Sequence, residues 1–153
     1  MFCGGTTGQL EGLQVVLGDV DPLKRIVLDS GNTNRISETR TDEVLQALPR
    51  GYRFAVICFN DDAAYGALRA ARNLGREADI AIVGQGCDRI IRNELRKRTT
   101  AIIGSTAFMP ERYGDKLVEL AKHILADKPV PPAVYMEHVF IDASNVDDYY
   151  ALS

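Results

Sequence analysis

The chain has 153 residues, the length of one domain, and 46% of them are hydrophobic against 25% charged, which excludes a largely disordered protein. The 21 Asp and Glu residues outnumber the 18 Lys and Arg residues, so the overall charge gives no support for nucleic-acid binding. No apolar run reaches the length of about 18 residues that a membrane-spanning helix needs.

The N-terminus and the cysteines leave the cellular compartment open. Met1–Gly5 lacks the basic region and apolar core of a secretory signal. The run Met1–Cys3 suggests the tail of a strand, which would make the chain a piece of a longer protein. An odd number of distant cysteines without a C-x-x-C pair predicts neither a disulfide framework nor a cysteine-rich zinc site; they are Cys3, Cys58 and Cys87.

Short β-branched runs alternate along the chain with amphipathic stretches. The predicted strands are residues 24–29, 53–59, 79–84, 100–105 and 133–142. The first four are almost wholly apolar, which favours parallel strands that are covered on both faces. The last run alternates in part between apolar and polar residues, as an edge strand does.

Helical spacing appears between these strands. One apolar stripe predicts a helix over residues 61–74, and a second stripe predicts a helix over 111–126. Shorter helices are expected over 9–17, 37–48 and 88–97. This order predicts an α/β fold of three layers, a parallel sheet with helices on both faces, as one lobe spanning residues 1–153. The stripes are Ala64, Ala67, Leu68, Ala71 and Leu74, then Tyr113, Leu117, Leu120, Ala121 and Ile124.

Four turns follow the predicted strands, and in an open parallel sheet ligands bind at the carboxyl ends of the strands. The turns cover residues 31–34, 60–62, 84–88 and 105–108. They combine amides, carboxylates, hydroxyls and one aromatic ring, the mixture that a neutral sugar needs. The candidate ligand-binding residues are Asn32, Asn60, Asp61, Gln85, Asp88 and Phe108.

Each of these polar residues also has a purely structural interpretation. Asn60, Asp61 and Asp88 are typical helix-capping residues, and Asn32 is typical of a turn. Taken one at a time, capping or turn formation is the commoner role. Their coincidence at one end of the sheet favours a binding site.

The sequence offers little for an enzyme, a cofactor or a metal. Gly84-x-Gly86 follows a strand, but Arg89 stands where the dinucleotide fingerprint needs its third glycine. Ser105 does not lie in a Gly-x-Ser-x-Gly nucleophile motif, and neither His123 nor His138 has a second histidine at metal-binding spacing. We therefore predict no catalytic residue, no metal and no cofactor.

A basic cluster comprises Arg89, Arg92 and residues 96–98. Lys97 and Arg98 lie near the end of a predicted helix, where cations interact favourably with the helix dipole. Because the chain is acidic overall, we interpret the cluster as a solvated helix face rather than a phosphate site.

Four segments, in order, resemble type I periplasmic sugar-binding proteins and the effector domains of lactose-repressor-type regulators. Residues 56–68 resemble the strand, Asn-Asp turn and Gly-Ala helix of that family, and 80–85 its next strand and ligand turn. Residues 103–114 resemble the crossing between its two lobes, and 129–135 the return. The segments read VICFNDDAAYGAL, IAIVGQ, IGSTAFMPERYG and PVPPAVY.

The resemblance implies that Asn60 binds a sugar hydroxyl, that the Gln85–Gly86 turn lies at the ligand and that Phe108 lies on the hinge side of the cleft. Two positions depart from the family pattern. Gly86 stands where many relatives have an aspartate, so Gln85 or Asp88 would supply that contact. Thr7 stands where relatives have a ligand-binding arginine.

The resemblance covers only the C-terminal lobe of a two-lobed protein. It implies a carbohydrate-binding lobe of a bacterial ABC-transporter solute-binding protein, periplasmic or extracytoplasmic, with a membrane permease as partner. The alternative is a cytoplasmic transcriptional regulator that contacts DNA through a domain absent from this chain. In the family, segment 110–132 belongs to the other lobe, so we expect it to pack on that lobe or on another chain in a homo-oligomer.

Overall fold

A six-stranded sheet lies at the centre of the computed structural model, which describes residues 2–3, 7–19 and 21–151. Its strand order is β2-β1-β3-β4-β5-β6. Neighbouring strands run parallel except at one edge, where β6 is antiparallel to β5. The strands are β1 (Phe2–Cys3), β2 (Val27–Leu28), β3 (Phe54–Cys58), β4 (Ile80–Gly86), β5 (Ile102–Ala107) and β6 (Val139–Ile141).

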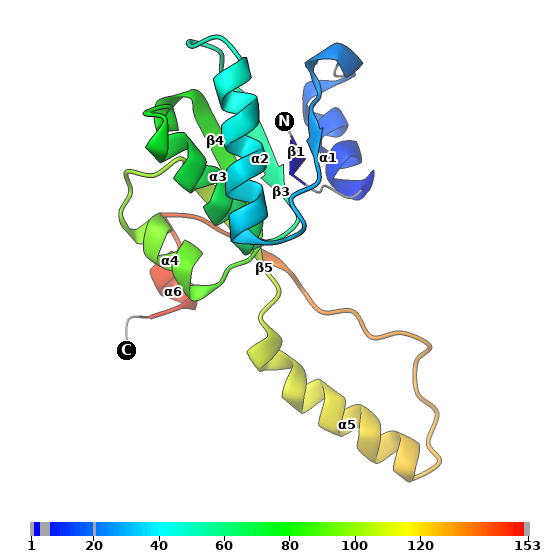
Figure 1. Cartoon of the computed structure of the whole chain (residues 1–153). Helices are drawn as coiled ribbons and strands as arrows, with labels where there is room; N and C mark the ends of the chain where they lie inside the picture. The colour runs from blue at the N-terminus through cyan, green and yellow to red at the C-terminus, as the bar shows by residue number, and fades with distance from the viewer. Residues whose placement is uncertain (1, 4–6, 20, 152–153) are drawn as a thin grey trace.

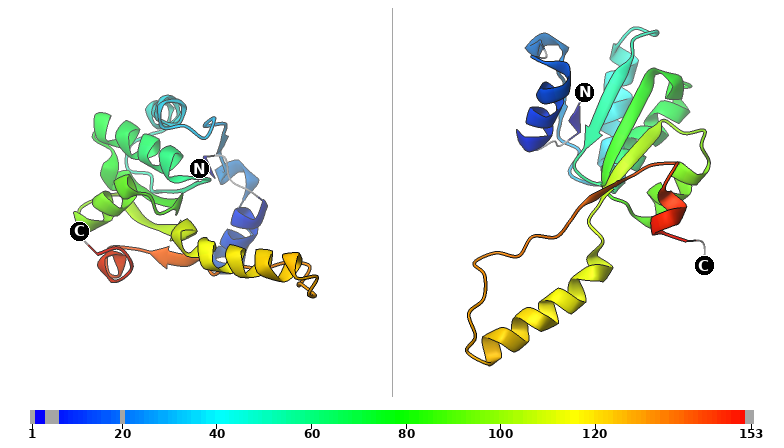
Figure 2. Two further views of the ribbon diagram at one scale, coloured as in Figure 1. Left: turned by 90° about the horizontal axis from the view of Figure 1, so that it is seen from below. Right: turned by 180° about the vertical axis from the view of Figure 1, so that it is seen from behind.

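Helices lie on both sides of this sheet. Helices α2 and α3 cover one face, and α1 lies on the other side near the β1–β2 edge (Figure 1 and Figure 2). The β1-to-β2 connection crosses the sheet in the opposite direction to the next two, so right-handed crossovers place its helix on the opposite face. The predicted three-layer α/β architecture is confirmed. The helices are α1 (Thr7–Leu17), α2 (Asn34–Ala47), α3 (Asp61–Asn73), α4 (Arg89–Arg96), α5 (Tyr113–Leu125) and α6 (Val146–Tyr149).

The hydrophobic core lies between α3 and the sheet. The apolar stripe predicted for this helix is fully buried at Ala64, Ala67, Leu68 and Ala71, and it packs with strand residues such as Ile82. Small side chains let α3 approach the sheet closely, and Gly66 lets it approach α2. Helices α2 and α3 therefore form one rigid layer that positions the carboxyl ends of the strands. No helix in the described ranges is both long and apolar enough to cross a membrane.

Two predicted strands are shorter than the sequence pattern indicated. Within the described ranges, the run 24–29 pairs with β1 only at Val27–Leu28. The run 133–142 pairs only at Val139–Ile141, the residues that face β5. Residues 133–138 lie outside any strand, after a proline-rich connector. The four-residue helix α6 was not predicted.

Helix α5 projects away from the sheet on two connecting segments (Figure 1). No residue of α5 is buried. On its predicted apolar stripe, Tyr113 and Leu120 are half-buried, whereas Leu117 is 61% exposed and Ile124 is 55% exposed. Within the described residues, this stripe therefore has no element packed over it.

Candidate functional site

The carboxyl ends of β2 to β5 meet at one edge of the sheet, and the predicted site residues lie there. Asn32 follows β2, the pair Asn60 and Asp61 follows β3, and Phe108 follows β5. Gln85 is the penultimate residue of β4, and Asp88 lies just before α4. Adjacent strands are only about 4.8 Å apart, so the fold gathers these segments into one short edge. We call residues 30–34, 60–61, 85–88 and 107–108 the carboxyl-end rim.

Asn60 ties two loops of the rim together. Its Oδ1 accepts a hydrogen bond of 2.8 Å from the Ala63 amide, which caps α3, and its Nδ2 donates to the Asn32 carbonyl at 2.9 Å. Asn32 has a φ of 52° and an exposed side chain, so it forms the turn that brings its carbonyl to Asn60. The capping and turn interpretations are confirmed for these two residues. An amide carries two donor hydrogens, so Asn60 retains one for another acceptor.

Asp61 points inward rather than toward solvent. Asp61 is only 4% exposed, and its Oδ1 accepts a hydrogen bond of 2.6 Å from the Ser105 hydroxyl. Its Oδ2 accepts a hydrogen bond of 2.6 Å from the Asp88 amide. The Ser105 Oγ in turn accepts from the Cys87 amide at 3.0 Å. Both carboxylate oxygens are thus used to hold the β4–α4 turn against β5.

Two glycines make room for this buried carboxylate. A Cβ at Gly84 would collide with Asp61 Oδ1 and would lie 3.3 Å from the Ala64 Cβ. Gly86 has a φ of 125°, a backbone conformation that other residues rarely adopt. The Gly-x-Gly pattern therefore serves the Asp61 network.

Burial changes the ionisation of the groups around this network. It raises the pKa of Asp61 above its usual 3.8, although the hydrogen bonds from Ser105 and Asp88 favour the charged form. Burial, together with the nearby Asp61 charge, raises the pKa of the Cys87 thiol to about 12. Cys87 is therefore a neutral thiol at physiological pH, which fits its interpretation as a small packing residue.

Asp88 and Gln85 lie on either side of the same turn. The Asp88 Oδ1 accepts hydrogen bonds of 2.9 and 3.0 Å from the Ile90 and Ile91 amides, so it caps α4 although the residue is exposed. Gln85 is half-buried and pairs in register with Thr106 of β5. Ligand contact by either residue stays a prediction.

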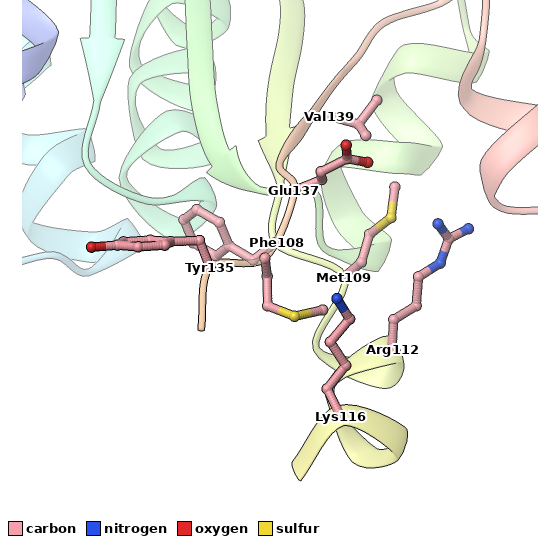
Figure 3. A pocket seen from close by; sticks show the side chains of 8 residues that line it. Phe108, Met109, Arg112, Lys116, Tyr135, Glu137 and Val139 are labelled. Atoms are coloured by element: carbon pink, nitrogen blue, oxygen red, sulfur yellow. The ribbon is translucent and has the colours of Figure 1, made fainter. Parts of the chain in front are cut away.

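Phe108 lines a depression of about 500 Å³ at the junction of the sheet and the α5 segment. Its ring lies 5.0 Å from the imidazole of His138, between centroids, at an interplanar angle of 58°. Figure 3 shows Phe108 and Tyr135 on one side of the depression and Arg112 and Lys116 on the other. The remaining lining residues are Met109, Met136, Glu137 and Val139.

Sequence reasoning missed two partners of the predicted site. The sequence places Ser105 among the hydroxyls of the 105–108 turn and outside a nucleophile motif, but it does not predict the hydrogen bonds that Ser105 makes with Asp61 and the Cys87 amide. Tyr135 was placed in a strand rather than at the depression. A hydroxyl residue in an otherwise apolar buried strand was the one available signal for Ser105, because such a group needs a partner.

The basic cluster is less solvated than predicted. Arg96 donates to Asp147 at 2.7 Å, and the Arg92 guanidinium lies 4.2 Å from the centroid of the Tyr150 ring. These two arginines hold α6 and the residues after it against α4. No group of three His, Cys, Asp or Glu side chains within the described ranges is placed to hold a metal ion.

Comparisons with known proteins identify the architecture. No family model matches the chain, and no curated protein matches its sequence. Its structure matches a periplasmic solute-binding protein of an ABC transporter from Actinobacillus succinogenes with bound D-allose. The TM-score is 0.75 and the sequence identity is 18%, and the match covers 97% of this chain and 53% of that one. The chain has the fold of one lobe of a type I periplasmic binding protein.

Two further structures show the same partial coverage. The arabinose-binding protein of an ABC transporter from Shewanella sp. ANA-3, bound to L-arabinofuranose, gives a TM-score of 0.77 at 16% identity over 97% of this chain and 52% of that one. An ABC sugar transporter subunit from Rhodobacter sphaeroides gives 0.76 at 20% identity over 95% and 55%. The chain thus spans about half the length of these type I binding-protein structures.

Proposed function

We propose that this chain is the sugar-binding lobe of a solute-binding protein that serves a bacterial ABC importer. The observation that carries the proposal is the carboxyl-end rim, which gathers Asn60, Gln85 and Phe108 at the ends of three adjacent strands. The fold is that of proteins whose structures hold D-allose and L-arabinofuranose. A cellular location outside the cytoplasm and a membrane permease as partner belong to the same proposal.

Recognition in this proposal is non-covalent, and the chain is not an enzyme. Asn60 donates its second amide hydrogen to a sugar hydroxyl, and Gln85 both donates and accepts. The ring of Phe108 packs on the C–H face of the sugar. Asn32 and Asp88 border the site. Asp61 does not contact the sugar but supports the site from the protein interior, through its hydrogen bonds with Ser105 and the Asp88 amide. A second lobe completes the site by closing over the sugar.

Sugar titration followed by NMR tests this function. We expect pentoses or hexoses to shift the backbone amides of Asn60, Gln85 and Phe108 with a dissociation constant of about 1 mM or weaker, because half of the contacts are missing. Phe108→Ala should weaken this binding about tenfold. Tyr52→Ala is the matched control, since Tyr52 is an exposed aromatic residue just before the amino end of β3, away from the carboxyl-end rim.

Two results would contradict the proposal. Amide shifts confined to the amino ends of the strands would place the ligand elsewhere. Micromolar binding by this chain would show that no second lobe is needed. The described residues offer no specific support for the regulator alternative.

We also propose that segment 110–132 packs on a second lobe or, without one, on another copy of this chain. The exposed stripe of α5 supports this proposal. Multi-angle light scattering of the chain should show an oligomer that Leu117→Lys disrupts, with Lys122→Glu on the same helix as control. A monomer at high concentration would contradict self-association and leave the second lobe as the partner.

A further inference from the structure

The turn between β4 and α4 has an unusual main chain that needs outside support. Gly86 has a φ of 125°, and Cys87 has a φ of 56°, in the left-handed region. A residue with a Cβ occupies that region at a cost, so it stays there only when surrounding contacts hold it. The support must come from outside the turn, because Gly86 carries no side chain and the Cys87 thiol is a weak hydrogen-bonding group.

That support comes from Asp61 and Ser105, which lie on different elements. The two amides that follow Gly86 both donate to these side chains, Cys87 to Ser105 Oγ at 3.0 Å and Asp88 to Asp61 Oδ2 at 2.6 Å. The Ser105 hydroxyl donates to Asp61 Oδ1 at 2.6 Å, which joins the two supports. Ser105 is fully buried and Asp61 is 4% exposed, so water does not replace these contacts.

The network needs a carboxylate at position 61. Both groups that face the Asp61 oxygens are donors, the Ser105 hydroxyl and the Asp88 amide. A carboxylate accepts on both oxygens, whereas an amide has one oxygen and one NH₂ group. An asparagine could accept from the Asp88 amide with its one oxygen, but its NH₂ group would then face the Ser105 Oγ, so the Ser105 hydroxyl hydrogen would lose its acceptor.

The neighbouring residue extends the support to a third segment. Asn60 holds the loop after β2 through the Asn32 carbonyl, while Asp61 holds the turn after β4 and the end of β5. Asn60, just before α3, and Asp61, its first residue, therefore link the rim segments that follow β2, β3 and β4 and connect them to Ser105 within β5.

We propose that Asp61 is a positioning residue that fixes the Gly86–Asp88 turn, and with it Gln85 and Asp88, in the shape that meets a sugar. This inference rests on the proposed sugar-binding function. The carboxyl-end rim is then a preformed half-site, and the ligand pays no cost for ordering it.

The test compares Asp61→Asn with Asp62→Asn in the full chain. Asp62 is an exposed aspartate in the same first turn of α3, so the control removes the same charge. In Asp61→Asn we expect the amides of Cys87 and Asp88 to exchange with solvent at least about tenfold faster, as loss of a buried hydrogen bond predicts. The Asp88 amide proton should also move upfield, because it no longer donates to a charged oxygen. Asp62→Asn should change neither property.

Sugar binding gives the second measurement. Affinity should fall about tenfold in Asp61→Asn and stay within about twofold of the unchanged chain in Asp62→Asn. Unchanged exchange of the Cys87 and Asp88 amides in Asp61→Asn would overturn the positioning role. If Asp61→Asn does not fold, Ser105→Ala replaces it, and unchanged exchange of the Cys87 amide is then the refuting result. If the unchanged chain binds no sugar while the two amides respond as expected, the proposed function fails and the structural half of the inference stands.

Discussion

Replacing Gly66 with alanine tests the packing that holds the rim in place. Gly66 lies in α3 where this helix meets α2, and an added Cβ would lie 2.8 Å from the Ser37 Cβ and 2.9 Å from the Glu38 amide nitrogen, with the Asn34 carbonyl oxygen closer still. Two of these three atoms belong to the backbone of α2, so no side-chain rotation relieves the collision. The helices must separate.

The expected cost follows from three contributions. Alanine gains about 1 kcal/mol over glycine in a helix interior. Overpacking of a tight contact costs about 1–3 kcal/mol, and the upper part of that range applies because backbone atoms are involved. Separation also strains the buried hydrogen bond of 2.7 Å from the Ser37 hydroxyl to the Ala63 carbonyl, which is worth about 1 kcal/mol. The gain from alanine and the cost to the hydrogen bond cancel, so the net loss of stability is about 2–3 kcal/mol.

Urea unfolding followed by circular dichroism measures this loss. The control is Gly114→Ala on α5, where an added Cβ meets nothing within 4 Å. We expect the control to keep or slightly raise stability. A Gly66→Ala variant as stable as the unchanged chain, with the same dependence on urea, would show that the α2–α3 contact is looser than the structure indicates.

Three further predictions concern buried charged groups. Burial raises the pKa of Glu94, but hydrogen bonds from Arg72 and Lys97 outweigh burial and lower the pKa below 4.5. The stability that Glu94 contributes should therefore be lost as pH falls through this lowered pKa. Urea unfolding of the unchanged chain and of Glu94→Gln across that pH range checks this. Burial raises the pKa of Asp61 above 3.8, so the stability of the unchanged chain relative to Asp61→Asn should fall as pH rises through the raised value, in the same assay. Arg76, 3% exposed, donates to the carbonyls of Leu48 and Pro49, so Arg76→Met should cost about 2–3 kcal/mol in thermal or urea unfolding.

Local sequence patterns predicted the helices and strands whose apolar residues recur at a regular spacing. The stripe over 61–74 identified α3, since helical periodicity selects the same residues that face the sheet. The apolar runs identified β3, β4 and β5 to within two residues at either end, because these central strands carry apolar residues on both faces. The coverage of both faces that these runs favoured is incomplete, since Ile103 of β5 is 54% exposed.

The ends of the sheet depend on partners that are distant in sequence. Among the described residues β2 pairs with β1 only at Val27 and Leu28, and nothing in the run 24–29 reveals this. β6 begins at Val139 because only there does the chain reach β5. The parallel pattern of the other strands also gave no sign that this edge pair is antiparallel.

The candidate site was predictable at its caps but not in its interior. Asn60 and Asp88 precede helices, so their capping roles follow from local sequence. Asp61 is an aspartate like Asp88 and also lies at the start of a helix. Its carboxylate nevertheless points inward and accepts a hydrogen bond from the Ser105 hydroxyl, 44 residues away in the sequence. Only the register between β4 and β5, which pairs Gly84 with Ser105, brings that hydroxyl beneath the turn.

Half of a binding site can bind weakly for two different reasons, and the hydrogen bonds of the rim indicate which one applies here. A disordered rim would lose affinity because the ligand must order it, and stabilising the rim would then restore binding. In this chain the hydrogen bonds of Asn60 and Asp61 already connect the rim segments that follow β2, β3 and β4, whereas the stripe of α5 has no covering element in the described residues. Weak binding would then reflect absent contacts, so addition of a second lobe, rather than stabilisation of this one, should raise the affinity.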